Sequence, residues 1–125
     1  MARSEKAILN DALILGTAEP ATLLYRQNTG TAWQGRRLNR GAGAVVQVKP
    51  GMVILEEARP LTFGVPGAGD IVGVHRGIPI QGEGKTLTGA QRQAQIAFQR
   101  QWELAGGRYI LFRSPEEFLA GLRGE

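Results

Sequence analysis

Two carboxylates and a lysine in the segment from residue 64 to residue 95 have the types and order that metal-dependent phosphodiester cleavage requires. Asp70 comes first, and the triplet Glu83-Gly84-Lys85 follows a short hairpin-like stretch. Carboxylate oxygens bind hard divalent cations, and a lysine beside them can steady an attacking water molecule or a phosphate. The segment therefore raises the hypothesis of a metal-dependent phosphodiesterase.

The stretch between these groups is predicted to be a β-hairpin. Residues 71–74 and 78–81 are short, β-prone and apolar, and they flank the turn His75-Arg76-Gly77. Antiparallel pairing centred on this turn gives the partners Val74–Pro79 and Val72–Gln81.

The same register sets Asp70 opposite Glu83. Like charges directly across a ladder repel, so a bound cation would explain why a fold pairs them. Glu83 and Lys85 are two residues apart, and on a strand they project from one face. The alternative is a solvated hairpin end with a surface ion pair, and spacing alone leaves both interpretations open.

Two nucleotide-binding motifs are only partly present. Gly84-Lys85-Thr86 is like the end of a P-loop, but the position where that motif needs a glycine holds Pro79, which has no N–H. Glycines 64, 67 and 69 match a dinucleotide-binding fingerprint only loosely. That motif follows a strand, and no strand is predicted before these glycines. We therefore expect no nucleotide cofactor.

Composition narrows the classes of protein. With 125 residues and 42% hydrophobic residues, the chain is expected to form one domain over residues 1–125 with a real core. The absence of cysteine excludes disulfides, thiolate zinc sites and cysteine nucleophiles. His75 is the only histidine, which excludes a histidine-rich metal site. Its place in a turn predicts an exposed, non-catalytic side chain.

The charge balance is basic, with 15 Lys and Arg residues against 11 Asp and Glu residues, and 12 of the 15 are arginine. Arginine suits bidentate phosphate contacts, and Arg36, Arg37 and Arg40 form a cluster. This favours a polyanionic partner over merely solvated basic faces. Neither a signal peptide nor a membrane-length apolar run is evident, so we expect an intracellular location and no membrane partner.

The N-terminal segment is predicted to be a helix over residues 5–15, capped by Ser4 and ended by Gly16. Glu5 lies three and four residues before Ile8 and Leu9, so it shares their inward face. An inward carboxylate needs a partner or a metal ion. The alternative is that Glu5 only favours the helix N-terminus through the dipole.

The middle of the chain is predicted as a strand, a turn, a loop, a hairpin and a connection, over residues 22–27, 28–30, 31–40, 44–55 and 56–62. At the end of the first strand, Arg26 and Asn28 are expected either to contact phosphate or to stabilise the turn. Trp33 in the loop is expected either to stack on a base or to pack against protein.

The C-terminal part is predicted as helix, strand and helix. The capping box Thr88-x-x-Gln91 starts a helix over residues 89–105, with Gln95 near its beginning and with an apolar stripe that includes Phe98 and Trp102. A strand over residues 109–112 and a helix capped by Ser114 and ending near residue 122 follow.

The chain resembles the virus-type replication–repair nuclease (VRR-NUC) domain of the PD-(D/E)XK nuclease superfamily. The similarity covers nearly the whole chain and is specific through order and spacing. It is carried by Glu5, Arg26-x-Asn28-x-Gly30, Gly67-x-x-Asp70, Glu83-x-Lys85-Thr86-x-Thr88-Gly89, Gln95, Gly106-Gly107-Arg108-Tyr109 and Arg113-Ser114. Two departures are Gly84, where the family usually has a branched apolar residue, and the glycine before Asp70, where it often has a serine.

The resemblance implies an α/β fold of the restriction-endonuclease type, a central mixed sheet flanked by helices. It also implies Mg²⁺- or Mn²⁺-dependent hydrolysis of DNA phosphodiesters. Asp70 and Glu83 would bind metal, Glu5 would be a further ligand or orient a water molecule at the metal, Lys85 would position the nucleophile or offset charge, and Gln95 would support them. The DNA-contact candidates are Arg26, Asn28, Arg36, Arg37, Arg40, Thr86 and Arg92.

Stand-alone viral and bacterial members of this family are structure-specific DNA repair endonucleases. By that resemblance we expect a homodimer acting on four-way (Holliday) junctions, encoded by a phage or located in a bacterial cytoplasm. Gly82 and Gly84 soften the strand that carries Glu83, so a non-catalytic DNA-binding module that retains the fold is an alternative. A role for residues 36–40 in binding RNA or a protein partner is another.

Overall fold

The computed structural model describes residues 3–37, 43 and 45–125. The chain forms two compact units. Unit 1 consists of Met1–Thr29 and Gly64–Glu125, and unit 2 consists of Gly30–Phe63. Each unit is considered by itself below.

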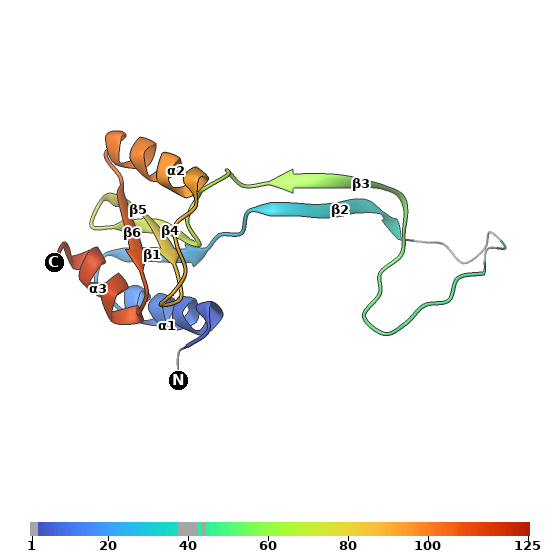
Figure 1. Cartoon of the computed structure of the whole chain (residues 1–125), viewed down its shortest axis with the longest axis horizontal. Coiled ribbons are helices and arrows are strands. Elements are labelled where there is room, and N and C mark those ends of the chain that lie inside the picture. Colours follow the sequence, from blue (N-terminus) through green and yellow to red (C-terminus); the bar gives the residue numbers. More distant parts are fainter. Residues whose placement is uncertain (1–2, 38–42, 44) are drawn as a thin grey trace. The chain divides into compact units, whose positions relative to one another are not determined.

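Unit 1 is built on a four-stranded mixed sheet with the strand order β1-β4-β5-β6. The two parallel neighbours are β5 and β6, while the other pairs are antiparallel. The expected α/β class with a mixed sheet and flanking helices is confirmed (Figure 1). The strands are β1 (Thr22–Arg26), β4 (Ile71–His75), β5 (Ile78–Gly84) and β6 (Arg108–Phe112).

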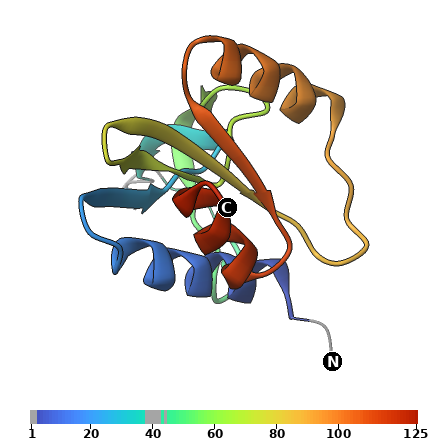
Figure 2. The same ribbon diagram turned by 90° about the vertical axis from the view of Figure 1, so that its left-hand side faces the viewer.

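Three helices cover the sheet of unit 1. Helices α1 (Glu5–Thr17) and α3 (Pro115–Arg123) lie on one face, and α2 (Gln93–Leu104) lies on the other (Figure 2). As predicted, Ser4 caps α1 and Ser114 caps α3, each accepting a backbone N–H bond at 3.2 Å. Helix α1 runs past Gly16, because this glycine is buried against α3 rather than serving as a stop.

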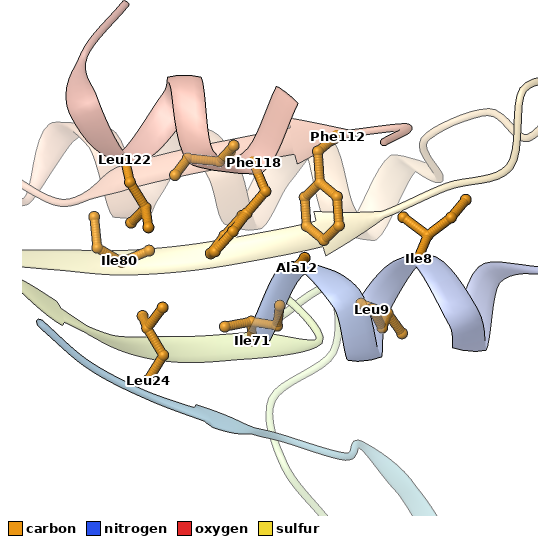
Figure 3. Close-up of a cluster of buried hydrophobic side chains, with 10 residues drawn as sticks. Ile8, Leu9, Ala12, Leu24, Ile71, Ile80, Phe112, Phe118 and Leu122 are labelled. Atoms are coloured by element: carbon orange, nitrogen blue, oxygen red, sulfur yellow. The ribbon is translucent and has the colours of Figure 1, made fainter. Parts of the chain in front are cut away.

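The main core lies between the sheet and the pair α1–α3 (Figure 3). Phe112 and Phe118 meet there with ring centroids 4.9 Å apart. The face covered by α2 is less closed, since Phe98 and Trp102 stack on each other but stay half-buried. The core cluster consists of Ile8, Leu9, Ala12, Leu24, Ile71, Ile80, Ile110, Phe112, Phe118 and Leu122.

The hairpin β4–β5 has the predicted register, with Val74 opposite Pro79 and Val72 opposite Gln81. Arg76 and Gly77 both have positive φ, 49° and 82°, which is the geometry of a two-residue type I′ turn. This turn fixes the pairing and therefore sets which residues of β5 share a face.

His75 is not exposed as predicted. Its side chain is buried, and its Nδ1 lies 2.6 Å from Thr22 Oγ1 on β1. The partner is 53 positions away in the chain, so a turn assignment from local sequence did not reveal it.

Unit 2 is an antiparallel ribbon of β2 (Gly30–Arg37) and β3 (Leu55–Phe63) (Figure 1). The prediction of a loop over residues 31–40 was therefore wrong for residues 31–37, while residues 38–40 lie outside the described residues. The prediction of a connection over residues 56–62 was also wrong. Every residue of β2 is exposed, so burial imposes no alternating pattern on its sequence. The predicted hairpin at residues 44–55 has its turn at Pro50–Gly51, but the described residues beside that turn are not strands.

Helix α2 starts at Gln93 rather than at the predicted residue 89. The Arg113 guanidinium donates hydrogen bonds to the carbonyl oxygens of Thr86 and Gly89, at 2.5 and 2.6 Å, and these bonds hold the preceding segment as a loop. The Gln95 side chain accepts from the Arg92 N–H at the actual helix start. The predicted capping box at Thr88 is therefore unused.

Candidate metal centre

Three carboxylates from separate parts of unit 1 converge in one place. Glu5 begins α1, Asp70 precedes β4, and Glu83 lies near the end of β5. One oxygen of each lies within 4.8 Å of the others. They line a cavity of about 410 Å³ that Lys85 and Gln95 also line. Sequence reasoning placed these five residues in one site, and the structure brings all five together.

The alternation of β5 explains why Glu83 faces this cavity. Gln81, Glu83 and Lys85 project from one face of the strand, and all three side chains are buried. Glu83 Oε1 accepts a hydrogen bond from Gln95 Nε2 at 2.6 Å and lies 3.4 Å from Lys85 Nζ. Glu83 Oε2 is buried and has no hydrogen-bond partner among the described residues. One oxygen is thus held in place while the other is unsatisfied.

Asp70 is held at the end of the β4–β5 ladder. Its Oδ2 accepts from the Gly84 N–H at 3.2 Å, and the neighbouring Gly69 N–H donates to Gln81 Oε1 at 2.7 Å. A Cβ on Gly69 would lie 2.7 Å from the Gly82 carbonyl oxygen. The bare backbone of Gly69 therefore lets the segment before Asp70 lie directly against β5.

The electrostatics of the cavity disfavour a second unneutralised carboxylate. Burial, and after it the charge of Asp70, raises the pKa of Glu83 from 4.5 to about 7, although Lys85 opposes the shift. At neutral pH the metal-free protein therefore holds this carboxyl partly protonated. A cation between the three carboxylates would remove that penalty.

The donor set fits a hard divalent cation such as Mg²⁺ or Mn²⁺. All three groups are carboxylates, the ligand type that such ions prefer. The unsatisfied Glu83 Oε2 supplies a desolvated oxygen with a free lone pair. Glu5 is exposed, so its long side chain can adjust to an ion that the other two hold.

The predicted DNA-contact residues are dispersed. Arg92 lines the cavity, and Thr86 is half-buried. Arg26, the last residue of β1, and Asn28 are both exposed. Arg36 and Arg37 are exposed on β2 in unit 2, where Arg36 pairs with Glu57 at 2.9 Å. Arg40 lies outside the described residues.

Two residues that support the site were given no role in it from the sequence. Gln81 orients Gly69, and Arg113, which sequence comparison included only in the motif of the family resemblance, holds the loop after Lys85. Tyr109, from the same motif, has a buried hydroxyl without a partner among the described residues. Burial and the charge of Glu83 raise the pKa of Tyr109, so its phenol stays neutral. The alternation of the strand could have pointed to Gln81, since it shares the face of Glu83 and Lys85.

No protein-family model and no curated protein matches this chain. Within the described part of the chain, none of the helices has the length and apolar character needed to cross a membrane.

Proposed function

We propose that this protein is a metal-dependent endonuclease that hydrolyses phosphodiester bonds in DNA. The carrying observation is the meeting of Glu5, Asp70 and Glu83 around a buried, unsatisfied carboxylate oxygen, with Lys85 beside it. As part of the same proposal, the sheet and helices of unit 1 are a restriction-endonuclease-like fold, as the VRR-NUC resemblance implies.

The residues of the chain have distinct roles in this proposal. Asp70 and Glu83 would hold a Mg²⁺ or Mn²⁺ ion, with Glu5 as the adjustable third ligand. When bound, the ion would supply Lewis-acid stabilisation of the phosphodiester and activation of water. Lys85 holds a positive charge 3.4 Å from Glu83, where it can orient the nucleophile and offset charge developing on the phosphate.

Gln95 fixes the orientation of Glu83 while accepting from the Arg92 N–H with its other end. These two hydrogen bonds connect Glu83, the proposed metal ligand, to the start of α2. Arg92 lines the same cavity and offers a guanidinium to a phosphate of the substrate. The site therefore combines acidic groups that hold a cation with basic groups that attract DNA.

The form of the substrate belongs to the proposal as well. The net charge of +4 suits a nucleic acid, and the resemblance points to four-way junctions cut by a homodimer. A two-fold dimer would present two such cavities to a symmetric substrate. Sedimentation at micromolar protein tests this part: a monomer that still cuts junctions symmetrically argues against it.

The decisive experiment is cleavage of labelled four-way junction, flap and linear duplex DNA with Mg²⁺, with Mn²⁺ or with EDTA. We expect metal-dependent cutting, and Asp70→Asn should lower its rate by about a thousandfold or more. Asp11→Asn is the matched control, because this half-buried α1 acid does not line the cavity and pairs only with Arg3 among the described residues.

The outcomes separate the proposal from its main alternative. Cutting that needs metal and Asp70 supports the nuclease, and the ranking of substrates gives its class. Tight DNA binding without cutting under any metal would instead identify a non-catalytic DNA-binding module. Equal rates for Asp70→Asn and Asp11→Asn would remove the carboxylate site from the mechanism.

A further inference from the structure

The ribbon of unit 2 is too exposed to be stable through its own packing. All residues of β2 are exposed, and β3 is half-buried only at Leu55 and Glu56. A two-stranded hairpin alone is marginally stable in water. Large side chains such as Trp33 and Leu61 remain 68% and 46% exposed. The exposed side chains of both faces are therefore available to a binding partner.

The charge of the chain is concentrated in the same segment. Residues 30–63 contain five Lys and Arg residues against two Glu residues, which gives net +3 out of the net +4 of the chain. These residues are about a quarter of the sequence. Exposed Arg37 and Arg59 lie on β2 and β3. The partner that this charge favours is a polyanion.

The distribution of apolar side chains argues against a second copy of the chain as the partner. Paired residues share a face of the ribbon. Trp33 and Pro60 therefore lie on one face, while the pair Ala32–Leu61 lies on the other. Gln34 and Arg59 place polar groups on the face of Leu61. Phe63, paired with Gly30, adds a second large apolar side chain to the face of Leu61. This apolar part ends at the Gln34–Arg59 pair and does not extend along the ribbon, as the apolar centre of a protein interface would.

We propose that the β2–β3 ribbon binds duplex DNA by lying in its major groove. The major groove has the width of a two-stranded β-ribbon, and such ribbons bind DNA in this way in other folds. The ribbon face that carries Trp33 and Pro60 lies toward the base edges, and the long side chains of Arg37 and Arg59 reach the phosphates that border the groove. This inference rests on the proposed function, since it assumes that the substrate is DNA, and it assigns the duplex arms of that substrate to unit 2.

The test measures binding of labelled linear duplex in EDTA, so that the cleavage chemistry plays no part. The double variant R37Q/R59Q is compared with R76Q/R123Q, which removes the same charge from exposed positions of unit 1 that do not line the cavity. Neutralising a phosphate contact lowers the slope of log affinity against log salt by about 0.9. We expect R37Q/R59Q to lower that slope by roughly two and R76Q/R123Q to leave it nearly unchanged.

The position of the ribbon on the DNA is tested by fluorescence. Trp33 and Trp102 are the only tryptophans, so Trp102→Phe leaves Trp33 as the sole reporter and Trp33→Phe leaves Trp102. We expect duplex DNA to change the emission of Trp33 and not that of Trp102, and a major-groove dye to displace the protein better than a minor-groove dye. Unchanged Trp33 emission, or displacement by the minor-groove dye alone, overturns the groove placement.

Failure of this inference is distinguishable from failure of the proposed function. Equal salt slopes for the two double variants, with metal-dependent cutting that still needs Asp70, would leave the nuclease and remove the ribbon as its grip on DNA. If R37Q/R59Q instead abolished self-association in sedimentation, the ribbon would be a contact between copies of the chain. Absence of duplex binding by the wild-type protein would overturn the inference outright.

Discussion

The two faces of β5 are the most instructive contrast in the molecule. Ile80, Gly82 and Gly84 face the core, while Gln81 and Glu83 alternate with them and face the cavity. The first face is apolar and closely packed. The second is buried too, but it is polar, charged and incompletely hydrogen-bonded. The strand β5 therefore has one face whose packing stabilises unit 1 and one face whose buried polar and charged groups lower its stability.

The glycines belong to the packed face and need not weaken the site. A Cβ on Gly82 would lie 2.7 Å from Phe118 Cε1, and one on Gly84 would lie 2.9 Å from Leu9 Cδ2. Helices α1 and α3 approach the strand closely because these side chains are absent. Close packing on one face holds the backbone that presents Glu83 on the other. The glycines thus have a structural reason that does not depend on a loss of catalysis.

The largest expected effect comes from changing the cavity face alone. Glu83→Gln keeps the shape of the side chain but removes a charged ligand, and we expect DNA cleavage to fall by about a thousandfold. The metal-free variant should be more stable than the wild type at neutral pH, because an unfavourable buried charge is gone. Cleavage assays and urea denaturation measure the two effects. An inactive variant that was also less stable would mean that Glu83 supports the fold rather than the chemistry.

Changing the packed face should have the opposite signature. Gly82→Ala inserts a methyl group against Phe118 and should destabilise the protein by about 1–3 kcal/mol. Gly89→Ala is the control, because its Cβ would lie 3.2 Å from Thr86 Oγ1, a hydroxyl that can rotate away. Adding Phe118→Leu should recover part of the loss in a double-mutant cycle measured by urea denaturation. Full additivity would show that Gly82 and Phe118 do not compete for the same space.

The cost of the cavity face should be visible in the pH dependence of stability. Because the pKa of Glu83 is raised from 4.5 to about 7, the folded state binds more protons than the unfolded state between these values. The free energy of unfolding of the metal-free protein should therefore fall as pH rises from about 4.5 to about 7. We expect a decrease of about 2 kcal/mol, which is less than the full pKa shift would give because solvent in the open cavity screens the charge.

Denaturation in EDTA at several pH values, with Glu83→Gln as the reference, isolates this contribution. As pH falls, the free energy of unfolding of the wild type should rise relative to that of Glu83→Gln. Added Mg²⁺ should stabilise the wild type most above pH about 7, where the carboxylate is ionised. A difference that does not vary with pH would show that Glu83 is not strained by its surroundings.

Local sequence predicted the parts of this contrast that local rules control. The turn at Arg76-Gly77 fixed the β4–β5 register, and that register places Asp70 beside β5. Spacing on α1 predicted that Glu5 shares the inward face of Ile8 and Leu9, and its side chain does line the cavity. The inward prediction was wrong in burial, because Glu5 at the start of the helix is exposed while Ile8 and Leu9 are buried. Ser4 and Ser114 marked their helices because capping depends on neighbouring residues only.

What could not be predicted depends on residues distant in sequence. The packing reason for Gly82 is Phe118, and the burial of His75 comes from Thr22 across the sheet. The late start of α2 follows from Arg113, well beyond that helix. The ribbon was missed because exposed strands leave no burial pattern in their sequence.

The smallest effect should come from the residue that links the cavity face to α2. Gln95→Ala removes the hydrogen bond to Glu83 Oε1 and the bond from the Arg92 N–H, while the three carboxylates remain. We expect a loss of roughly 10–100-fold in Mg²⁺ affinity, measured by calorimetry, as for other groups that orient a metal ligand. Gln93→Ala is the matched control, since this exposed residue lies in the same helical turn. Because Gln95 acts through Glu83, its substitution should add little to Glu83→Gln. If the two losses were instead additive, Gln95 would have a role of its own toward the substrate.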